Sequence, residues 1–440
     1  MSVAFRDQVQ RVAQPFDFLK TALDKLIPFF LFLYAVSLLT SMSGMEIFGW
    51  GTCLLTVLYI LGSLLVARRP RVFTLGCELP LLGLLIVAGL GLYLNAPDAD
   101  HLAAMGKLRW VVMLYLLAYA LALQNNLNRI LNTLMIVGTI VACYAIFQHF
   151  TGIDLIRGDN RSVTIAPFAG ATVYQNTGFL SHHLTYGYSF GMLICFPLAA
   201  LLLGRRRPIM FRLLCTLSVL LIGLSLLWTY GRGVWMATAL AFFVLAAYVS
   251  KRHLVAFLVI IGIIGGVLYT GDSGFQERFA SMWASNYTSN TDRQDLWRAN
   301  LAMFQDYPWL GVGYGQNEEI LHKYYDKLDI ANTFGGHAHN NYLQMLSTTG
   351  LLGMICYMLF ILSFLLTTHR LWMEVPKTHY WHRVLVLGAL GAQVTMHAGG
   401  VTQWNFGDAE VNHLFIFILA MIGYLSERYS RGIVPDDYAL

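Results

Sequence analysis

Long apolar runs recur along the whole chain, and shorter polar stretches separate most of them. Each run has about the length at which a helix crosses the hydrocarbon core of a bilayer, roughly 17–25 residues. Because a lipid-embedded segment must satisfy its own backbone hydrogen bonds, the runs predict about twelve transmembrane helices. They lie near residues 26–42, 47–67, 79–95, 108–124, 130–149, 184–203, 211–229, 234–250, 253–270, 350–368, 383–399 and 411–427.

Two polar segments are too long to be simple turns between neighbouring spans. Residues 150–183 are rich in Gly, Thr and Asn and show no helical period. Residues 271–349 form the longest polar stretch and separate the ninth span from the tenth. We therefore expect an all-α polytopic membrane protein with one large helical loop. This divides the chain into a first bundle part, 1–270, the loop itself, and a last part, 350–440.

Helical patterning continues inside the second polar segment. Thr291 or Asp292 is placed to cap a helix that runs to about Asp306, and Pro308 stops it. Leucine, alanine and methionine recur along one face of this helix at helical spacing. A second helix is expected over residues 317–327.

The placement of Lys and Arg predicts which side of the membrane each loop faces, because cytoplasmic loops carry the excess. With the N-terminus in the cytoplasm, most of the 29 basic residues fall in inside segments, which are densest at 68–71, 205–212 and 251–252. Both termini are then cytoplasmic, and both long polar segments face the other side. The pI of about 8.8 therefore reflects membrane orientation, and no nucleic-acid partner is expected.

The composition agrees with a membrane bundle. Hydrophobic residues make up 57% of the chain and charged residues only 12%, whereas soluble domains carry roughly 25% charged residues. The six cysteines include no CxxC pair, so the pattern indicates neither a disulfide framework nor a thiolate metal site. No Asp or Glu lies deep in a predicted span, which disfavours an ion-coupled transporter. A lipid or solute transporter is the alternative from a different functional class.

Arginines on the outer side are not explained by membrane orientation. Arg232 follows Tyr230 in TYGRGVW, a tight turn whose glycines let the backbone turn and a ligand approach. Arg161 in GDNRSV, and Arg293 and Arg298 in TDRQDLWR, lie in the two long polar segments. Guanidinium groups bind phosphates in bidentate fashion, whereas snorkelling to lipid headgroups is the alternative role. Arg232, Arg161 and Arg293 together predict an anion site with pyrophosphate as the expected ligand, and Arg298 is a further candidate.

Histidines are the candidates for acid–base chemistry, because the imidazole pKa lies near neutral pH. His337 and His339 occur in HAHN, where Asn340 suits a helix N-cap that would hold His339 at the mouth of the bundle. A helix cap with incidental histidines is the alternative. A metal site is disfavoured because no Cys or well-placed carboxylate accompanies the pair. His182 and His183 are expected either to line the same site or to lie at the membrane interface.

Three stretches carry a resemblance to a known family. They are YGRGVW (230–235), TDRQDLWRANLAMFQDYPWLGVGYG (291–315) and HAHNNYLQMLSTTGLLG (337–353). The chain resembles the O-antigen ligases of Gram-negative bacteria, within the O-antigen ligase and polymerase superfamily. That family has a Ser/Gly-Arg-Gly turn, an Arg…Trp helix running into Pro-x-x-Gly-x-Gly, and His-Asn-x-x-Leu before a glycine and a span. All three occur here in the same order.

The resemblance implies a function in lipopolysaccharide biosynthesis at the bacterial inner membrane. The implied donor is a polysaccharide on undecaprenyl pyrophosphate, and the implied acceptor is a sugar hydroxyl of the lipid A–core, on the periplasmic face. The family's reaction is that of a metal-independent, inverting glycosyltransferase without a cofactor. Its partners are these two glycolipids and the membrane lipids. O-antigen polymerase and protein O-oligosaccharyltransferase share the motifs and are the alternatives within the superfamily.

The resemblance also implies residue roles where the motifs match. The family's histidine before asparagine is the base, which corresponds to His339, and His337 is expected to support it. The turn arginine corresponds to Arg232 and the helix arginine to Arg293, and both are expected to hold the pyrophosphate. Arg161 has no firm motif and is assigned to the same ligand only by its position in the other long segment.

Overall fold

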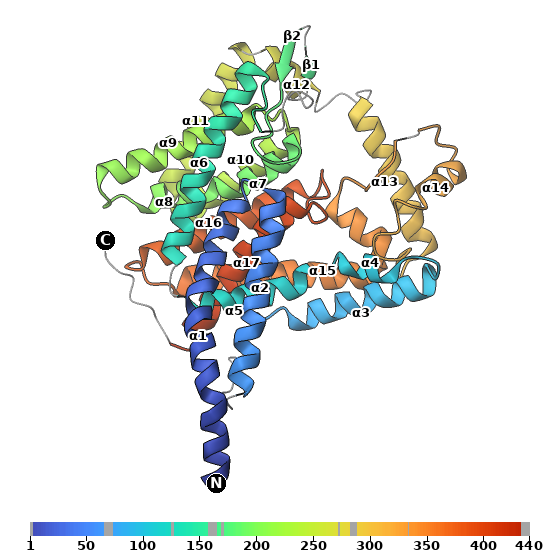
Figure 1. The fold of residues 1–440 in the computed structure, drawn as a ribbon. Helices are drawn as coiled ribbons and strands as arrows, with labels where there is room; N and C mark the ends of the chain where they lie inside the picture. The colour runs from blue at the N-terminus through green and yellow to red at the C-terminus, as the bar shows by residue number, and fades with distance from the viewer. Residues whose placement is uncertain are drawn as a thin grey trace.

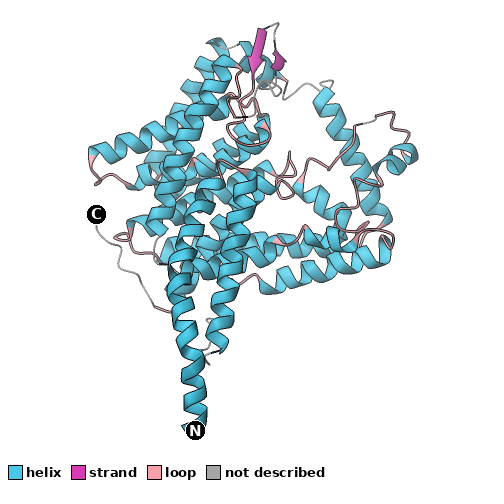
Figure 2. Ribbon diagram, viewed as in Figure 1, coloured by secondary structure: helices cyan, strands magenta, loops and turns pink. Residues whose placement is uncertain are grey.

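The computed structural model of the chain is almost entirely helical (Figures 1 and 2), which confirms the predicted fold class. A short antiparallel hairpin in the first polar segment is the exception. It pairs β1 (Ile165–Phe168) with β2 (Ala171–Tyr174). The structure describes residues 3–65, 74–124, 127–156, 165–168, 171–271, 273–281, 288–332 and 334–432. The candidate Arg161 lies outside these residues.

The helices follow one another along the chain with short connections, except around the two long polar segments. In order they are α1 (Val3–Ser37), α2 (Met42–Leu65), α3 (Glu78–Asn95), α4 (His101–Gly106), α5 (Trp110–Leu123), α6 (Leu127–Thr151), α7 (His183–Leu193), α8 (Cys195–Leu203), α9 (Ile209–Leu227), α10 (Arg232–Val249), α11 (Lys251–Gly271), α12 (Ser273–Ala280), α13 (Thr288–Asp306), α14 (Leu321–Lys327), α15 (Asn341–Glu374), α16 (Tyr380–Gly399) and α17 (Ala409–Ser430).

Ten helical segments in the described part of the chain are long and apolar enough to cross a membrane. Two of these segments combine neighbouring helices, namely α4 with α5 and α7 with α8. The ten segments together correspond to ten of the twelve predicted spans. The other two predicted spans, 26–42 and 383–399, coincide with the end of α1 and with α16, which are helices but fall outside this group.

Helix α17 forms the centre of the bundle. In its apolar stretch 89% of the residues are buried. Helices α5, α7, α15 and α16 pack against it. Every residue of α17 from Glu410 to Glu427 is buried, so other parts of the protein surround this helix on all sides. In contrast, α11 has no buried residue among those described and therefore faces the lipid.

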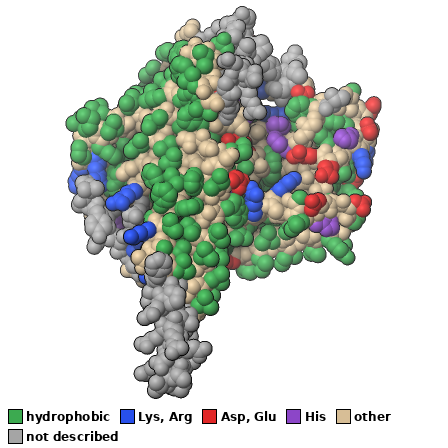
Figure 3. Space-filling view, viewed as in Figure 1, with side chains coloured by type: hydrophobic (Ala, Val, Ile, Leu, Met, Phe, Trp, Pro, Cys, Tyr) green, Lys and Arg blue, Asp and Glu red, His purple; other side chains and the backbone are tan. Residues whose placement is uncertain are grey.

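The second polar segment folds into a polar lobe, which we define as α13, α14 and the turns around them (288–332 and 334–340). The lobe has a small core in which Leu296, Ala299 and Met303 of α13 pack against Leu321 and Tyr325. The predicted apolar face of α13 is thus confirmed for these three residues, whereas Phe304, which the same spacing places on that face, is half-buried and lies outside this core. The lobe stands beside the bundle in Figure 1, and charged side chains gather over it in Figure 3.

Two helix starts in the lobe differ from the prediction. Helix α13 begins at Thr288, one turn earlier than a cap at Thr291 or Asp292 would allow. Its first turn contains Asn290, whose Oδ1 accepts a hydrogen bond from Arg232, so a tertiary contact holds this turn. Helix α14 begins at Leu321, because the preceding residues form turns that bury Asn317.

Buried amides join the polar lobe to α15. Asn317 Nδ2 donates to Asn300 Oδ1 of α13 at 3.0 Å and to Gln344 Oε1 of α15 at 2.9 Å. Gln344 Nε2 returns a hydrogen bond to Asn317 Oδ1 at 2.8 Å, and Ser347 Oγ donates to Asn300 Oδ1 at 2.8 Å. All four side chains are buried. Buried polar groups of this kind are stable only when they are hydrogen-bonded, so the network fixes the lobe on the bundle.

The lobe backbone also lies directly on α15. Val312 N donates to Ser347 O at 2.9 Å, and Leu351 N donates to Pro308 O at 2.8 Å. Gly311 has a φ of +68°, and a Cβ there would lie 2.3 Å from the carbonyl carbon of Thr348. Only glycine fits both the conformation and this close approach.

We predict that Gly311→Ala loosens the lobe from α15. The positive φ alone costs about 1–2 kcal/mol for a residue with a Cβ, and the backbone of α15 leaves no room for that atom. Thermal unfolding of the detergent-solubilised protein should therefore begin at a lower temperature. Gly106→Ala is the matched control, because a Cβ at Gly106 meets nothing within 4 Å. Equal unfolding temperatures for the two variants would contradict this account of the docking.

Candidate active site

The turn that carries both candidate histidines is held from two sides. Its middle residue, Ala338, is fully buried. The amide of Ala338 donates to Gln344 Oε1 at 2.8 Å, and its carbonyl accepts from Trp297 Nε1 at 2.9 Å. The same glutamine side chain that joins the lobe to α15 thus positions this turn. The flanking histidines are brought together, with their ring centroids 4.1 Å apart.

His339 adopts a left-handed backbone conformation, with a φ of 46°. Its amide donates to His337 Nδ1 at 3.1 Å, and its ring Nδ1 lies 2.6 Å from Gln403 Oε1. Asn340 is the N-cap of α15, as predicted, and its side chain accepts from the amides of Tyr342 and Leu343. The cap and the two histidine contacts place the His339 ring at the start of α15.

Both histidines are held neutral. Burial lowers the pKa of His337 to about 4, with the nearby charges of His339 and Arg293 acting in the same direction. Burial also lowers the pKa of His339, the hydrogen bond to Gln403 opposes this shift, and the charges of Arg293 and His182 add to it. Because Gln403 Oε1 is an acceptor, the His339 proton resides on Nδ1 and leaves the Nε2 lone pair available as a base.

Arg293 is a cation without a partner within the described residues. It forms no hydrogen bond or ion pair there, although it is close enough to both histidines for its charge to lower their pKa values. Burial lowers its own pKa, the Tyr188 hydroxyl opposes this, and the charge of Arg278 acts in the same direction as burial. Arginine remains protonated under such shifts. A protonated guanidinium in such a partly desolvated place is stabilised by an anion.

Arg232 is buried and engaged in the fold. Its Nη1 donates to the carbonyl of Ser281 at 2.6 Å and to the hydroxyl of the same residue at 3.3 Å, and its Nη2 donates to Asn290 Oδ1 at 2.8 Å. The end of α12 and the first turn of α13 are therefore joined at the start of α10. This arginine connects the polar lobe to the bundle, a role that the sequence pattern does not reveal.

The turn before α10 differs from the expected glycine turn. Tyr230, not a glycine, takes the left-handed conformation, with a φ of 52°. Its carbonyl accepts a hydrogen bond from Arg278 Nε at 3.0 Å. Gly233 instead permits close packing, because a Cβ there would lie 2.2 Å from Thr402 Oγ1 and 2.4 Å from the Tyr188 hydroxyl. The glycine after the arginine thus serves helix packing at this site.

Of the remaining candidates, His182 lies near His339, whereas Arg298 lies on the surface of the lobe. His182 caps α7 by accepting from the amide of Leu184, and its ring centroid lies 4.0 Å from that of His183. The charge of His182 acts on His339, so it belongs to the site. Arg298 does not, because its side chain is 60% exposed and lies 3.6 Å from Asp295 on the lobe surface. Within the described residues, no group of three or more His, Cys, Asp or Glu side chains is arranged to hold a metal ion.

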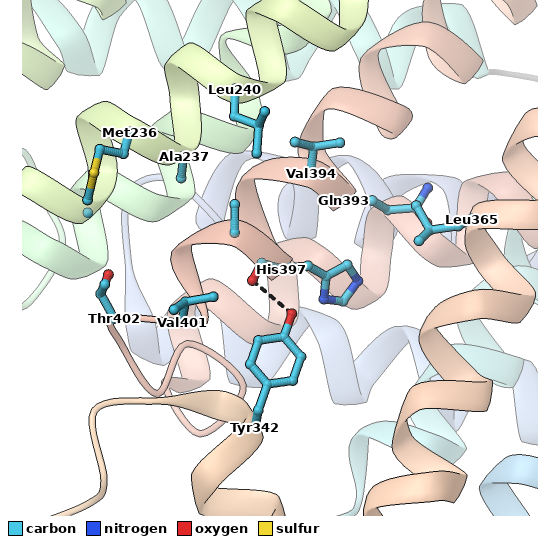
Figure 4. A pocket seen from close by; sticks show the side chains of 12 residues that line it. Met236, Ala237, Leu240, Tyr342, Leu365, Gln393, Val394, His397, Val401 and Thr402 are labelled. Atoms are coloured by element: carbon cyan, nitrogen blue, oxygen red, sulfur yellow. Dashed lines mark hydrogen bonds between the residues drawn. The ribbon is translucent and has the colours of Figure 1, made fainter. Parts of the chain in front are cut away.

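An open groove of about 540 Å³ runs between α10, α15 and α16 (Figure 4). It begins at Gly233 and Thr402, next to Arg232, and extends along the helices to Leu240 and Leu365. Apolar side chains form most of its wall. The Tyr342 hydroxyl, which lies in the groove, donates to the carbonyl of His397 at 2.9 Å, so its polar end is satisfied. The mostly apolar lining of the groove suits an alkyl chain.

Residues 216–358 match the family model described as O-antigen ligase. This match supports membership of the O-antigen ligase superfamily. The matched ligase domain contains Arg232, Arg293 and the two histidines of the turn, and it ends inside α15. No curated protein matches the chain at a significant level.

The sequence pattern did not identify three residues that contact the candidate residues of the ligase domain. Gln403 lies beyond the matched segment, in the connection from α16 to α17, and only the fold brings it to His339. Trp297 could have been found from the sequence, because it is the tryptophan of the family's Arg…Trp helix. In the structure its ring nitrogen donates to the carbonyl of Ala338 in the histidine turn. Arg278 is a basic residue of the second long polar segment and lies outside the three stretches that resemble the family, so the sequence pattern assigns it no role.

We predict that Gln403→Glu raises the pKa of His339. A carboxylate beside Nδ1 stabilises the protonated ring, so a higher pH is needed to remove its proton. At neutral pH the variant therefore carries a smaller fraction of the neutral base. Nitrogen-15 NMR of histidine-labelled protein in nanodiscs measures this titration directly.

Gln305→Glu is the matched control, because it adds the same charge on the exposed face of α13. It should leave the His339 titration unchanged. If His339 had the wild-type pKa in both variants, the claim that residue 403 controls the pKa of His339 would be wrong.

Proposed function

We propose that the chain is an O-antigen ligase that transfers a polysaccharide from undecaprenyl pyrophosphate to a sugar hydroxyl of the lipid A–core. The observation that carries this proposal is the proximity of a neutral imidazole, His339, to the cation of Arg293, which has no partner among the described residues and whose charge acts on the imidazole. A base for an incoming hydroxyl and a cation for a departing phosphate are the two groups that displacement at an anomeric carbon needs. Membership of the superfamily supports the same chemistry.

His339 acts as the general base. Its Nε2 takes the proton from the acceptor hydroxyl as that oxygen attacks the anomeric carbon of the donor. A new glycosidic C–O bond forms while the C–O bond to the pyrophosphate breaks, and the electron pair leaves with the phosphate oxygen. An attack from the side opposite the leaving group inverts the anomeric centre. The proton on His339 then passes to solvent, and Gln403 keeps the ring in the same tautomer throughout.

Arg293 and Arg278 stabilise the negative charge that develops on the departing undecaprenyl pyrophosphate. Arg293 has its guanidinium donors available within the described structure, whereas Arg232 already uses both terminal nitrogens on Ser281 and Asn290. We therefore assign Arg232 the task of holding α12 and α13 so that Arg293 faces the phosphate. His337 supports the base by accepting from the amide of His339.

The groove beside Arg232 accommodates part of the polyprenyl chain of the donor. Its mostly apolar wall, which includes residues from Gly233 to Leu365, matches a hydrocarbon chain. In this arrangement residues 271–349 form a periplasmic catalytic loop between two membrane parts, 1–270 and 350–440. The protein lies in the bacterial inner membrane with both termini in the cytoplasm, as the Lys and Arg distribution favours.

We predict that His339→Ala lowers the rate of ligation by about 10²–10⁴-fold, the contribution of a general base. Arg293→Ala should lower it by about 10²–10³-fold, as the loss of one electrostatic donor does. Rates are measured with purified protein of verified membrane insertion, a lipid-linked glycan and lipid A–core.

Arg298→Ala is the matched control for Arg293→Ala, because both arginines are on α13 and Arg298 faces solvent. Its rate should stay near that of the wild type. Wild-type ligation by His339→Ala or Arg293→Ala, at normal expression, would remove that residue from the mechanism.

We also predict that ligation is insensitive to chelation, since the proposed steps use only protein side chains. The measurement compares the rate before and after incubation with EDTA and removal of the chelate. Loss of activity that added Mg²⁺, Mn²⁺ or Zn²⁺ restores would contradict a metal-independent transfer.

A further inference from the structure

Phe334 is an exposed aromatic ring beside the candidate base. Its side chain is 41% exposed. The ring lies nearly parallel to that of His339, with an interplanar angle of 29° and 6.1 Å between the centroids. The proposed mechanism gives this ring no task, although it lies next to the group that takes the proton from the acceptor.

Hydrogen bonds on both sides hold the backbone of Phe334 in place. Its amide donates to Asn332 Oδ1 at 2.9 Å, and its carbonyl accepts from the Tyr325 hydroxyl at 3.0 Å. Tyr325 itself belongs to the core of the polar lobe. These contacts hold the backbone that carries the ring, and we call Phe334 together with Asn332 the ledge.

Asn332 bonds two carboxylates, and one of them, Asp295, has its other oxygen 3.6 Å from Arg298 Nη1. Asn332 Nδ2 donates to Asp292 Oδ1 at 3.0 Å. Within the described residues the second oxygen of Asp292 has no hydrogen bond, so it remains an acceptor. An aromatic face beside a carboxylate acceptor matches a sugar ring, whose C–H face is apolar and whose hydroxyls donate hydrogen bonds.

Neither the pyrophosphate nor the polyprenyl chain of the donor suits this position, and the base beside it takes its proton from the acceptor sugar, not from the donor glycan. The pyrophosphate carries negative charge, which Asp292 would repel and which the guanidinium groups of Arg293 and Arg278 attract. The polyprenyl chain is hydrocarbon and matches the apolar groove between α10, α15 and α16. The chemistry left for the ledge is that of a carbohydrate, placed where one of its hydroxyls reaches His339.

We propose that Phe334 and Asp292 form the subsite for the acceptor sugar. The ring of Phe334 stacks on the sugar, Asp292 accepts from one of its hydroxyls, and a further hydroxyl is directed at His339 Nε2. The inference rests on the proposed function and extends it, because it names the residues that select and orient the acceptor. The arginines then bind the leaving group and the ledge binds the nucleophile.

Steady-state kinetics test the subsite. Phe334→Ala should raise the KM for lipid A–core about tenfold or more while the KM for the lipid-linked donor stays unchanged. Phe334→Trp, which keeps an aromatic face, should retain a KM near that of the wild type and also shows that the position tolerates change. Asp292→Asn should raise the acceptor KM as well, because the amide replaces one acceptor oxygen with a donor.

Trp309→Ala is the control for loss of an exposed ring, since Trp309 is 62% exposed and belongs to the same lobe. Its acceptor KM should remain unchanged. An unchanged acceptor KM in Phe334→Ala, or an equal rise in the donor KM, would overturn the proposal.

Direct binding separates this inference from the proposed function. The probe is the isolated core oligosaccharide, observed by saturation-transfer NMR on the His339→Ala variant, which does not turn over. Binding that Phe334→Ala abolishes in that background supports the subsite even if no ligation is ever seen. Oligosaccharide binding that is identical with and without the ring overturns the subsite, and it leaves ligation by His339 and Arg293 standing.

Discussion

The side-chain amide of Gln344 is the interaction on which the arrangement of the site depends. Its oxygen accepts from Asn317 and from the amide of Ala338, and its nitrogen donates back to Asn317. One buried group on α15 thus holds both the polar lobe and the histidine turn. Leaving such buried partners unsatisfied costs about 1–3 kcal/mol for each group, so the network has little freedom to rearrange. The position of His339 relative to the membrane bundle follows from this constraint.

The chemistry of the site depends on charges that are not compensated locally. Burial and the charge of Arg293 keep both histidines of the turn neutral, while Gln403 determines which nitrogen of His339 carries the proton. In the proposed mechanism a neutral base therefore lies near Arg293, for which the described residues provide no hydrogen-bond or ion-pair partner. Arg232 contributes to this arrangement indirectly. Its hydrogen bonds join the end of α12 and the first turn of α13 to the start of α10.

The sequence predicts the parts of the structure that depend on local chemistry. Apolar length alone marks most of the helices, and Asn340 is recognisable as a cap because its own side chain bonds the next amides. The start of α13 was mispredicted because a tertiary contact to Asn290 stabilises its first turn. Gln403 has no local signal at all, since it acts on a residue far away in the chain. Arg232 was found by its motif, but its partners emerge only when the lobe is folded against the bundle.

The most direct test of the account is reconstitution of the purified protein in vesicles with a lipid-linked O-polysaccharide and lipid A–core. The account predicts that a ladder of glycan-modified lipid A–core appears and that undecaprenyl pyrophosphate is released in equal amount. Longer lipid-linked chains with an unmodified core would contradict it and indicate a polymerase. Movement of either lipid across the membrane without a new glycosidic bond would contradict the assignment of an enzyme.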